Sequence, residues 1–122
     1  MHLKHAQMTE HQIQAQIVNY FNQSFPTLRK CLFHVQNKAS NSIEGAKFKT
    51  LGVVAGISDL VLIHSNGTCF IELKDDKGKQ SEHQITFQRQ LAQLNHHYHI
   101  IRSLSEFKAL LSTLHPYNTI MP

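Results

Sequence analysis

The sequence contains little cysteine and no long hydrophobic run. Its two cysteines, Cys31 and Cys69, lie far apart and neither belongs to a C-x-x-C pair, so we expect neither a zinc knuckle nor a disulfide framework. No stretch approaches the roughly 18 apolar residues of a membrane span, and the first residues open no apolar run of signal-peptide length. These absences predict a soluble protein in a reducing compartment such as the cytoplasm.

Glycine, proline and charged residues are present at ordinary levels. Five Gly, three Pro and 16% charged residues against 41% hydrophobic ones exclude a fibrous or disordered chain. A length of 122 residues allows one domain with a real core. The formal charge of +4, with ten histidines, favours a polyanionic partner, although a basic surface that keeps the protein soluble explains it equally well.

Hydrophobic spacing and helix-capping signals predict a single mixed α/β domain. Three segments that begin at Thr9, Ser81 and Ser103 resemble capping boxes followed by apolar residues at helical spacing. Between them lie short runs rich in strand-forming residues. The expected elements are a helix over 9–23, strands over 31–35, 58–64 and 68–74, a helix over 81–95, a strand over 98–104 and a last helix from 103.

This order, α-β-β-β-α-β-α, predicts a central, mostly antiparallel mixed sheet flanked by helices. We expect the domain to span 9–115. Residues 1–8 are expected to form a flexible N-terminus, and residues 116–122 a frayed C-terminal tail.

Residues 36–56 show no steady hydrophobic period and are rich in Asn, Ser, Gly and Lys. We interpret them as a long basic loop, a kind of segment that often contacts a substrate. The alternative is a mobile insertion without a function of its own. The candidate DNA-binding residues of this segment are Asn37, Lys38, Lys47 and Lys49.

Asn66-Gly67 is a strong hairpin signal because both residues tolerate a positive φ. Side chains two apart on a strand share a face, so Glu72 and Lys74 should point the same way. In a hairpin centred on Asn66-Gly67, Asp59 lies level with Lys74 or just beyond it. Asp59 and Glu72 can then converge.

Two convergent carboxylates form a hard oxygen site that suits Mg²⁺ or Mn²⁺. Phosphodiester hydrolysis needs a hydroxide at neutral pH and stabilisation of charge on phosphorus; a metal supplies both, and Lys74 can assist. The competing interpretation is that Glu72 and Lys74 are surface residues of an exposed strand and that Asp59 caps a turn. The tripeptide Glu72-Leu73-Lys74 alone favours that simpler interpretation.

The residues around this tripeptide favour the metal site instead. It consists of Glu10, Gly52-Val53, Gly56-Ile57-Ser58-Asp59-Leu60, Phe70-Ile71-Glu72-Leu73-Lys74, and Gly78-Lys79-Gln80-Ser81 leading to Gln84. These elements, in this order over roughly 9–111, resemble the VRR-NUC domains of the PD-(D/E)xK nuclease superfamily. Such domains occur in Fanconi-associated nuclease and as stand-alone phage and bacterial proteins. The chain departs from the pattern at Ser58, where a proline usually precedes the aspartate, and proline there shapes backbone rather than chemistry.

The resemblance implies a restriction-endonuclease-like fold and a metal held by Asp59, Glu72 and the backbone carbonyl of Leu73. It implies Lys74 as catalytic lysine, with Glu10 and Gln84 as supporting site residues. The expected protein is then a Mg²⁺- or Mn²⁺-dependent DNA endonuclease of a bacterial or phage-infected cell. Stand-alone members suggest a homodimer that cleaves branched DNA such as Holliday junctions.

Several alternatives stay open at this stage. Glu10 is also a favourable acidic residue for a first helical turn, and Gln84 could simply close a capping box. We interpret His96, His97 and His99 as surface or interface residues rather than zinc ligands, because no accompanying ligand spacing supports them. Rival functions are a catalytically silent nucleic-acid-binding module, a monomeric nuclease that trims flaps or ends, and an interaction domain without DNA affinity.

Overall fold

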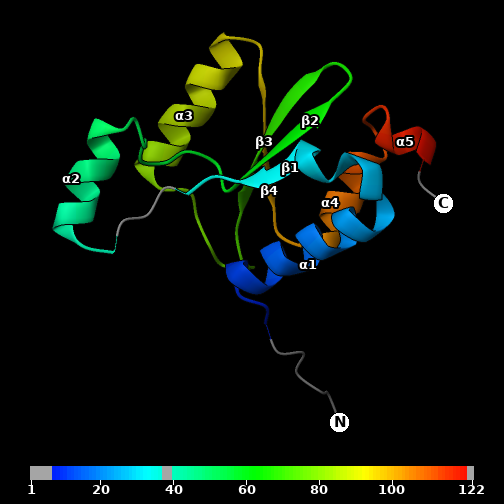
Figure 1. The fold of residues 1–122 in the computed structure, drawn as a ribbon, viewed down its shortest axis with the longest axis horizontal. Coiled ribbons are helices and arrows are strands. Elements are labelled where there is room, and N and C mark those ends of the chain that lie inside the picture. The colour runs from blue at the N-terminus through cyan, green and yellow to red at the C-terminus, as the bar shows by residue number, and fades with distance from the viewer. Residues whose placement is uncertain (1–6, 37–39, 121–122) are drawn as a thin grey trace.

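A computed structural model describes residues 7–36 and 40–120, with a four-stranded mixed sheet at its centre (Figure 1). The strands lie in the order β1-β2-β3-β4, antiparallel except for the parallel pair β3 and β4. The bounds are α1 Glu10–Ser24, the 3₁₀ helix η1 Pro26–Cys31, β1 Leu32–His34, α2 Ser42–Thr50, β2 Leu60–His64, β3 Gly67–Leu73, α3 Glu82–Gln93, β4 His97–Ile101, α4 Leu104–Leu111 and α5 Tyr117–Ile120. The predicted mixed sheet and the order of its main elements are therefore confirmed.

The hydrophobic core lies on one face of the sheet, under α1, α4 and α5, while α3 crosses the other face (Figure 1). Strand periodicity produces this division, since Leu60, Leu62, Ile71 and Leu73 alternate along β2 and β3 and are all buried. The apolar stripe of α1 packs against them. Its buried members are Ile13, Ile17 and Phe21.

The opposite face holds Phe70, which packs against Phe87 of α3 with ring centroids 5.5 Å apart. Side chains two residues apart share a strand face, so Glu72 faces the same side as Phe70. Glu72, the charged residue of β3, thus lies between the sheet and α3, away from the main core. No helix among residues 7–36 and 40–120 is long and apolar enough to span a membrane.

The predicted hairpin is confirmed, but its turn lies one residue earlier than predicted. Ser65 and Asn66 form the turn, and Gly67, with φ of +138°, is the first residue of β3 and pairs with His64. Moving the centre of a hairpin by one residue moves the register by two. Asp59, which precedes Leu60 opposite Ile71, therefore lies level with Glu72 rather than with Lys74.

The interpretation of 36–56 as one long loop is wrong, because Ser42–Thr50 form α2. Asn41 caps this helix by accepting a hydrogen bond from the backbone N–H of Glu44 at 2.8 Å. The helix has no buried residue, so no hydrophobic period marks it in the sequence. Asn37 and Lys38 lie outside the described residues.

The expectation of frayed structure from Pro116 is wrong as far as residue 120. Tyr117 is only 1% exposed, and its hydroxyl donates a hydrogen bond to the carbonyl of Ile63 at 2.6 Å. The backbone N–H of Ser65 donates to the carbonyl of His115 at 2.8 Å. The end of the chain therefore fastens to the β2–β3 hairpin. Of the expected flexible N-terminus, residues 1–6 lie outside the described part.

Replacing Tyr117 by Phe should destabilise the protein by about 1 kcal/mol, because the ring still fills the core while the carbonyl of Ile63 loses its donor. Chemical denaturation of the variant and of the wild type measures the difference. Equal free energies of unfolding would show that this hydrogen bond contributes nothing net to stability.

Candidate active site

Asp59 lies directly before β2 and is held through both its side chain and its backbone. Its Oδ2 accepts a hydrogen bond from the backbone N–H of Leu73 at 2.8 Å. Its carbonyl accepts from the backbone N–H of Val35 at 3.0 Å and contacts Nδ1 of His34 at 2.8 Å. Because a carbonyl oxygen only accepts, Nδ1 of His34 must carry the proton in this contact. Strands β1 and β3 together fix Asp59.

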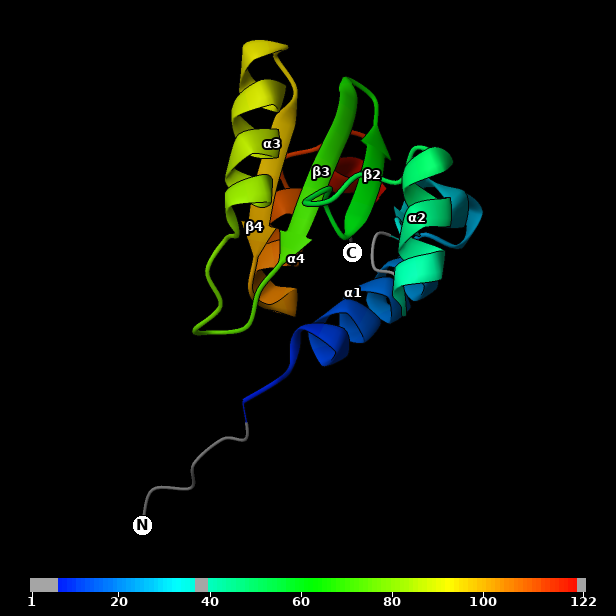
Figure 2. The ribbon, with the colours of Figure 1, turned by 90° about the vertical axis from the view of Figure 1, so that its left-hand side faces the viewer.

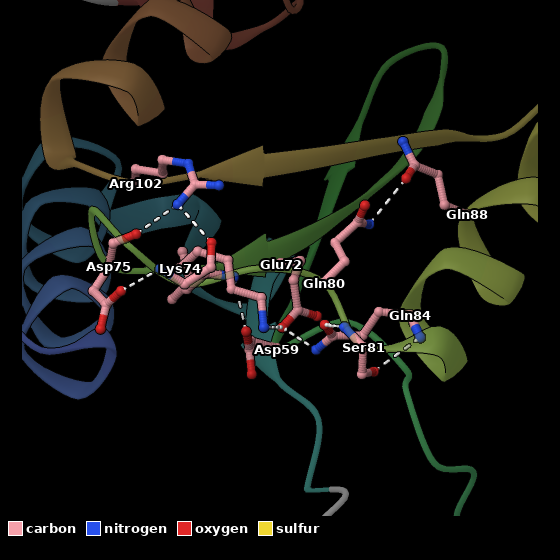
Figure 3. Close-up of polar contacts among 11 residues, drawn as sticks. Asp59, Glu72, Lys74, Asp75, Gln80, Ser81, Gln84, Gln88 and Arg102 are labelled. Carbon is pink, nitrogen blue, oxygen red and sulfur yellow. Dashed lines mark hydrogen bonds and ion pairs between the residues drawn. The ribbon is translucent and has the colours of Figure 1, made fainter.

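Glu72 and Lys74 point together from β3 toward the start of α3 (Figure 3). Both are buried, with 3% and 8% of their surface exposed, so the interpretation of Glu72 and Lys74 as ordinary surface residues is wrong. Oε1 of Glu72 accepts a hydrogen bond from Nε2 of Gln84 at 2.7 Å and lies 3.8 Å from Nζ of Lys74. Oε2 of Glu72 is buried and has no hydrogen-bond partner among the described residues.

Gln84 closes the capping box of α3, and its side-chain amide also contacts Glu72. Its backbone N–H donates to Oγ of Ser81 at 3.2 Å, and its Oε1 accepts from the backbone N–H of Ser81 at 2.8 Å, which completes a capping box. The amide nitrogen remains free to donate to Glu72. The cap of α3 therefore orients the amide that binds the carboxylate.

Burial and neighbouring negative charge raise the pKa of Glu72 from 4.5 to about 8. Burial is the largest cause, followed by the negative charge and the close carboxyl group of Asp59, while Lys74 acts in the opposite direction and Glu10 adds a smaller increase. The carboxyl groups therefore crowd one another without enough positive charge to balance them. Such a cluster favours a cation.

A cavity of about 320 Å³ brings the predicted site residues together. We call it the site cavity. It is lined by Glu10, Ala55, Gly56, Asp59, Glu72, Lys74, Ser81 and Gln84. A second cavity of about 240 Å³ also includes Glu10 and Asp59, and adds Leu73 and His34. Four separate segments thus supply the five residues that the sequence predicted, although their chemical roles remain predictions.

Arg102, to which the sequence assigned no role, holds the loop that follows Lys74. Its Nη1 donates to the carbonyls of Asp75 at 2.6 Å and Gly78 at 2.9 Å, as Figure 3 shows. A Cβ on Gly78 would come within 3.3 Å of Oε1 of Glu10 and 3.2 Å of Cδ of Lys74. The loop therefore packs tightly beside the site. An isolated arginine after a strand gives no sequence signal for this role.

Gly56 lets the chain pass against the start of α3. Its φ is +79°, and a Cβ there would lie 2.5 Å from Cβ of His83 and 2.9 Å from the backbone nitrogen of Gln84. Ser58, in the place where the resembled pattern has proline, is fully buried, and its Oγ donates to the carbonyl of Leu60 at 3.3 Å. Serine is thus accommodated without disturbing Asp59.

Substituting Gly56 by Ala should destabilise the protein by about 1–3 kcal/mol, because the new methyl group meets backbone at a positive φ. It should also weaken any activity of the site, since Gln84 must shift with its helix. Thermal unfolding measures the first effect. Gly52→Ala is the matched control, since Gly52 also has a positive φ of +90° but has nothing within 4 Å of its Cβ position. Equal losses in the two variants would mean that strain alone, and not contact with α3, is responsible.

The other described residues named in the sequence analysis do not line the site cavity. Lys47 and Lys49 are exposed on α2, which stands apart from the sheet in Figure 1 and lies toward the viewer in Figure 2. His97 and His99 stack with ring centroids 6.3 Å apart on β4. Within residues 7–36 and 40–120, no three or more His, Cys, Asp or Glu side chains are grouped so as to hold a metal ion. The candidate metal site therefore consists of two carboxylates, with the Leu73 carbonyl as a further predicted ligand.

No family model and no curated protein matches the sequence. Comparison of folds does find a relation. A solved structure described as a VRR_NUC domain protein matches with a TM-score of 0.73 and 23% sequence identity, over 91% of this chain and 89% of that one. The sheet order, the helices around it and the convergence of the predicted residues agree with the resemblance seen in the sequence. The chain therefore has the restriction-endonuclease-like fold of a VRR-NUC domain.

Proposed function

We propose that the protein is a divalent-metal-dependent endonuclease that hydrolyses phosphodiester bonds of DNA. The observation that carries this proposal is the site cavity, where Asp59, Glu72 and Lys74 lie together and a buried oxygen of Glu72 has no hydrogen-bond partner within residues 7–36 and 40–120. Charged groups are rarely buried unless they pair or coordinate an ion. A site made for chemistry explains their burial better than a structural role does.

The residues present fit Mg²⁺ or Mn²⁺. Both ions prefer oxygen ligands, and Mg²⁺ commonly takes only one or two carboxylates and keeps several waters. Asp59 and Glu72 would hold the ion, with the carbonyl of Leu73 as third protein ligand, and the unpartnered Oε2 of Glu72 is available for it. When bound, the metal would supply hydroxide at neutral pH and stabilise charge on the phosphoryl oxygens.

The side chains around the carboxylates have separate tasks. Lys74 would orient or deprotonate the attacking water and stabilise the negative charge that develops on phosphorus. Gln84 fixes the carboxylate of Glu72 through its 2.7 Å hydrogen bond. Glu10, at the start of α1 and facing the same cavity, would support the site from its other side.

The proposal is tested with purified protein and linear, nicked, flapped and four-way DNA, incubated in Mg²⁺, Mn²⁺ or EDTA. Cleavage in either metal and none in EDTA is the expected result. A catalytically silent binding module would instead retain DNA affinity in EDTA and leave every substrate intact in metal. An interaction domain without DNA function would show no salt-dependent DNA affinity.

Affinity for DNA should fall steeply with salt, and alanine at Lys38, Lys47 and Lys49 should flatten that dependence. Each lost phosphate contact reduces the slope of log affinity against log salt by about 0.9 for duplex DNA. Anisotropy titrations at several salt concentrations measure the slope. Alanine at Lys30 in η1, at the opposite end of α1 from Glu10, is the control. A triple variant with the wild-type slope would exclude these lysines from the binding surface.

We further propose that the protein acts as a homodimer on branched DNA such as a Holliday junction. One small domain supplies one site, whereas resolution of a junction needs two matched incisions, which a two-fold dimer provides. Light scattering and a comparison of substrates test this. A monomer that prefers linear or flapped ends would contradict the dimer and would favour end trimming, while the metal-dependent chemistry would stand.

A further inference from the structure

Helix α2 and the chain that follows it as far as Ala55 form a segment that we call the arm. The arm exposes apolar side chains and lysines. Ile43, Leu51 and Val54 are 83%, 69% and 56% exposed. Lys47 and Lys49 lie on the same arm and are also exposed. Of these residues, Val54 and Lys49 line a groove of the arm.

A Schellman motif gives the arm a defined shape. Gly52 has φ of +90°, and its backbone N–H donates to the carbonyl of Lys49 at 3.2 Å, while that of Val53 donates to the carbonyl of Phe48 at 2.8 Å. These two bonds end α2 and turn the chain back beside it. Phe48 and Lys49 lie three and four residues after Gly45, on one helical face.

A groove of about 510 Å³ runs between this helical face and the returning chain. We call it the arm groove. Its walls include Phe48, Lys49, Val53, Val54 and Ala55. The volume lies within the range of about 300–1,000 Å³ typical of small-molecule sites. The side chains that line it are apolar apart from Lys49.

The arm groove and the site cavity are neighbours, because Ala55 lines both. A ligand that fits both regions must carry a negatively charged part and a flat apolar part next to each other. A nucleotide has this composition: its phosphate suits lysine, and its base stacks on an aromatic ring. The net charge of +4 favours the same polyanionic ligand.

We propose that the arm groove binds the base of an unpaired nucleotide next to the phosphodiester held in the site cavity. This inference rests on the proposed nuclease function and names its substrate class. A base within a duplex is stacked and paired, and a surface groove reaches it only after it leaves the stack. The preferred substrate is therefore DNA with at least one unpaired nucleotide at the cleavage point, as at a flap, a gap or a frayed end, whereas a fully paired four-way junction would first have to open a base pair.

The test uses duplex DNA whose two ends are closed by ethylene-glycol linkers that carry no nucleotide, so that a one-nucleotide bulge is the single unpaired position; we call these molecules dumbbells. The bulge carries either thymine or an abasic analogue, and anisotropy in EDTA gives the ratio of the two dissociation constants. For the wild type, we expect the abasic DNA to bind between about fivefold and about 150-fold more weakly, as removal of one base–aromatic stack does. Phe48→Ala should bring this ratio close to one.

Val54→Asp is a second variant, at an exposed position where folding is not at risk, and should also lower the ratio. The matched controls are Ile43→Ala and Ile43→Asp, on the same helix but outside the groove, and both should keep the wild-type ratio. A wild-type ratio of one, or groove variants that keep the wild-type ratio, would overturn the inference. A change of mass in Val54→Asp without a change of ratio would assign the groove to a second copy and overturn it too.

The failure of this inference differs from the failure of the proposed function. Protein that cleaves DNA in metal but binds both dumbbells equally contradicts the base-binding groove alone. Protein that distinguishes the dumbbells but cleaves no DNA in Mg²⁺ or Mn²⁺ contradicts the nuclease proposal alone.

Discussion

Asp59→Asn, Glu72→Gln and Lys74→Ala should each reduce DNA cleavage by at least about 100-fold at saturating metal. The estimate follows from the cost of losing a ligand or a positioned charge in a catalytic site. None of the three side chains belongs to the hydrophobic core, so far-ultraviolet circular dichroism should show an unchanged fold. Rates are measured on the best substrate of the wild type, with Mg²⁺ and Mn²⁺ varied to saturation.

Matched controls make the same chemical changes nearby without entering the site cavity. Asp76→Asn, Lys79→Ala and Glu82→Gln alter exposed residues in the loop after β3 and the first turn of α3. These variants should retain the wild-type rate. If one of the three site variants kept near-wild-type activity, the role assigned to that residue would be wrong, and if all three did, the chemistry would lie elsewhere.

The sequence predicted which of these side chains come together, because its signals there are local and periodic. Alternation along β3 determines that Glu72 and Lys74 share a face. The hairpin then brings Asp59 to them. The turn lies one residue from its predicted place, which moves the strand register by two residues. Side chains of a strand return to the same face every two residues, so Asp59 is still predicted on the correct face. The burial of the charges, in contrast, depends on α3 and could not be seen in β3 alone.

The error at α2 has a different cause. Hydrophobic periodicity reveals a helix only when one face packs against the protein, and α2 has no buried residue. The end signals were nevertheless present, with Asn41 as N-cap and Gly52 in the Schellman position. We interpreted both as loop residues. Arg102 illustrates the remaining limit, since its partners Asp75 and Gly78 are backbone carbonyls, which have no sequence identity to detect.

Glu72 should make the stability of the metal-free protein depend on pH. Its pKa is about 8 in the folded protein, raised mainly by burial from an ordinary 4.5, so folding binds a proton between these values. Stability from this group is complete below about pH 4.5 and is lost as the pH rises toward 8. The loss reaches at most about 1.4 kcal/mol per pH unit for one proton. Glu72→Gln should remove it.

Two histidines change the stability with pH in the opposite direction. The quantity to measure is therefore the difference in melting temperature between the wild type and Glu72→Gln. Burial lowers the pKa of both His64 and His99, and their contribution to stability is therefore lost as the pH falls below 6.5. Above pH 7 both histidines are mostly neutral in the folded and the unfolded protein, so the fall in the wild-type melting temperature between pH 7 and 8 should be largely absent from Glu72→Gln.

Divalent metal should reverse this loss, because metal binding needs the ionised carboxylate and displaces its proton. At a fixed Mg²⁺ or Mn²⁺ concentration, the rise in melting temperature of the wild type should therefore grow from pH 6 to pH 8. The rise should be absent, or small and independent of pH, in Glu72→Gln. Calorimetric scans of both proteins, with and without metal, give these four curves. A metal-induced rise of the same size at pH 6 and pH 8 in the wild type would show that the ion binds without displacing a proton from Glu72, and would remove this carboxylate from the proposed ligands.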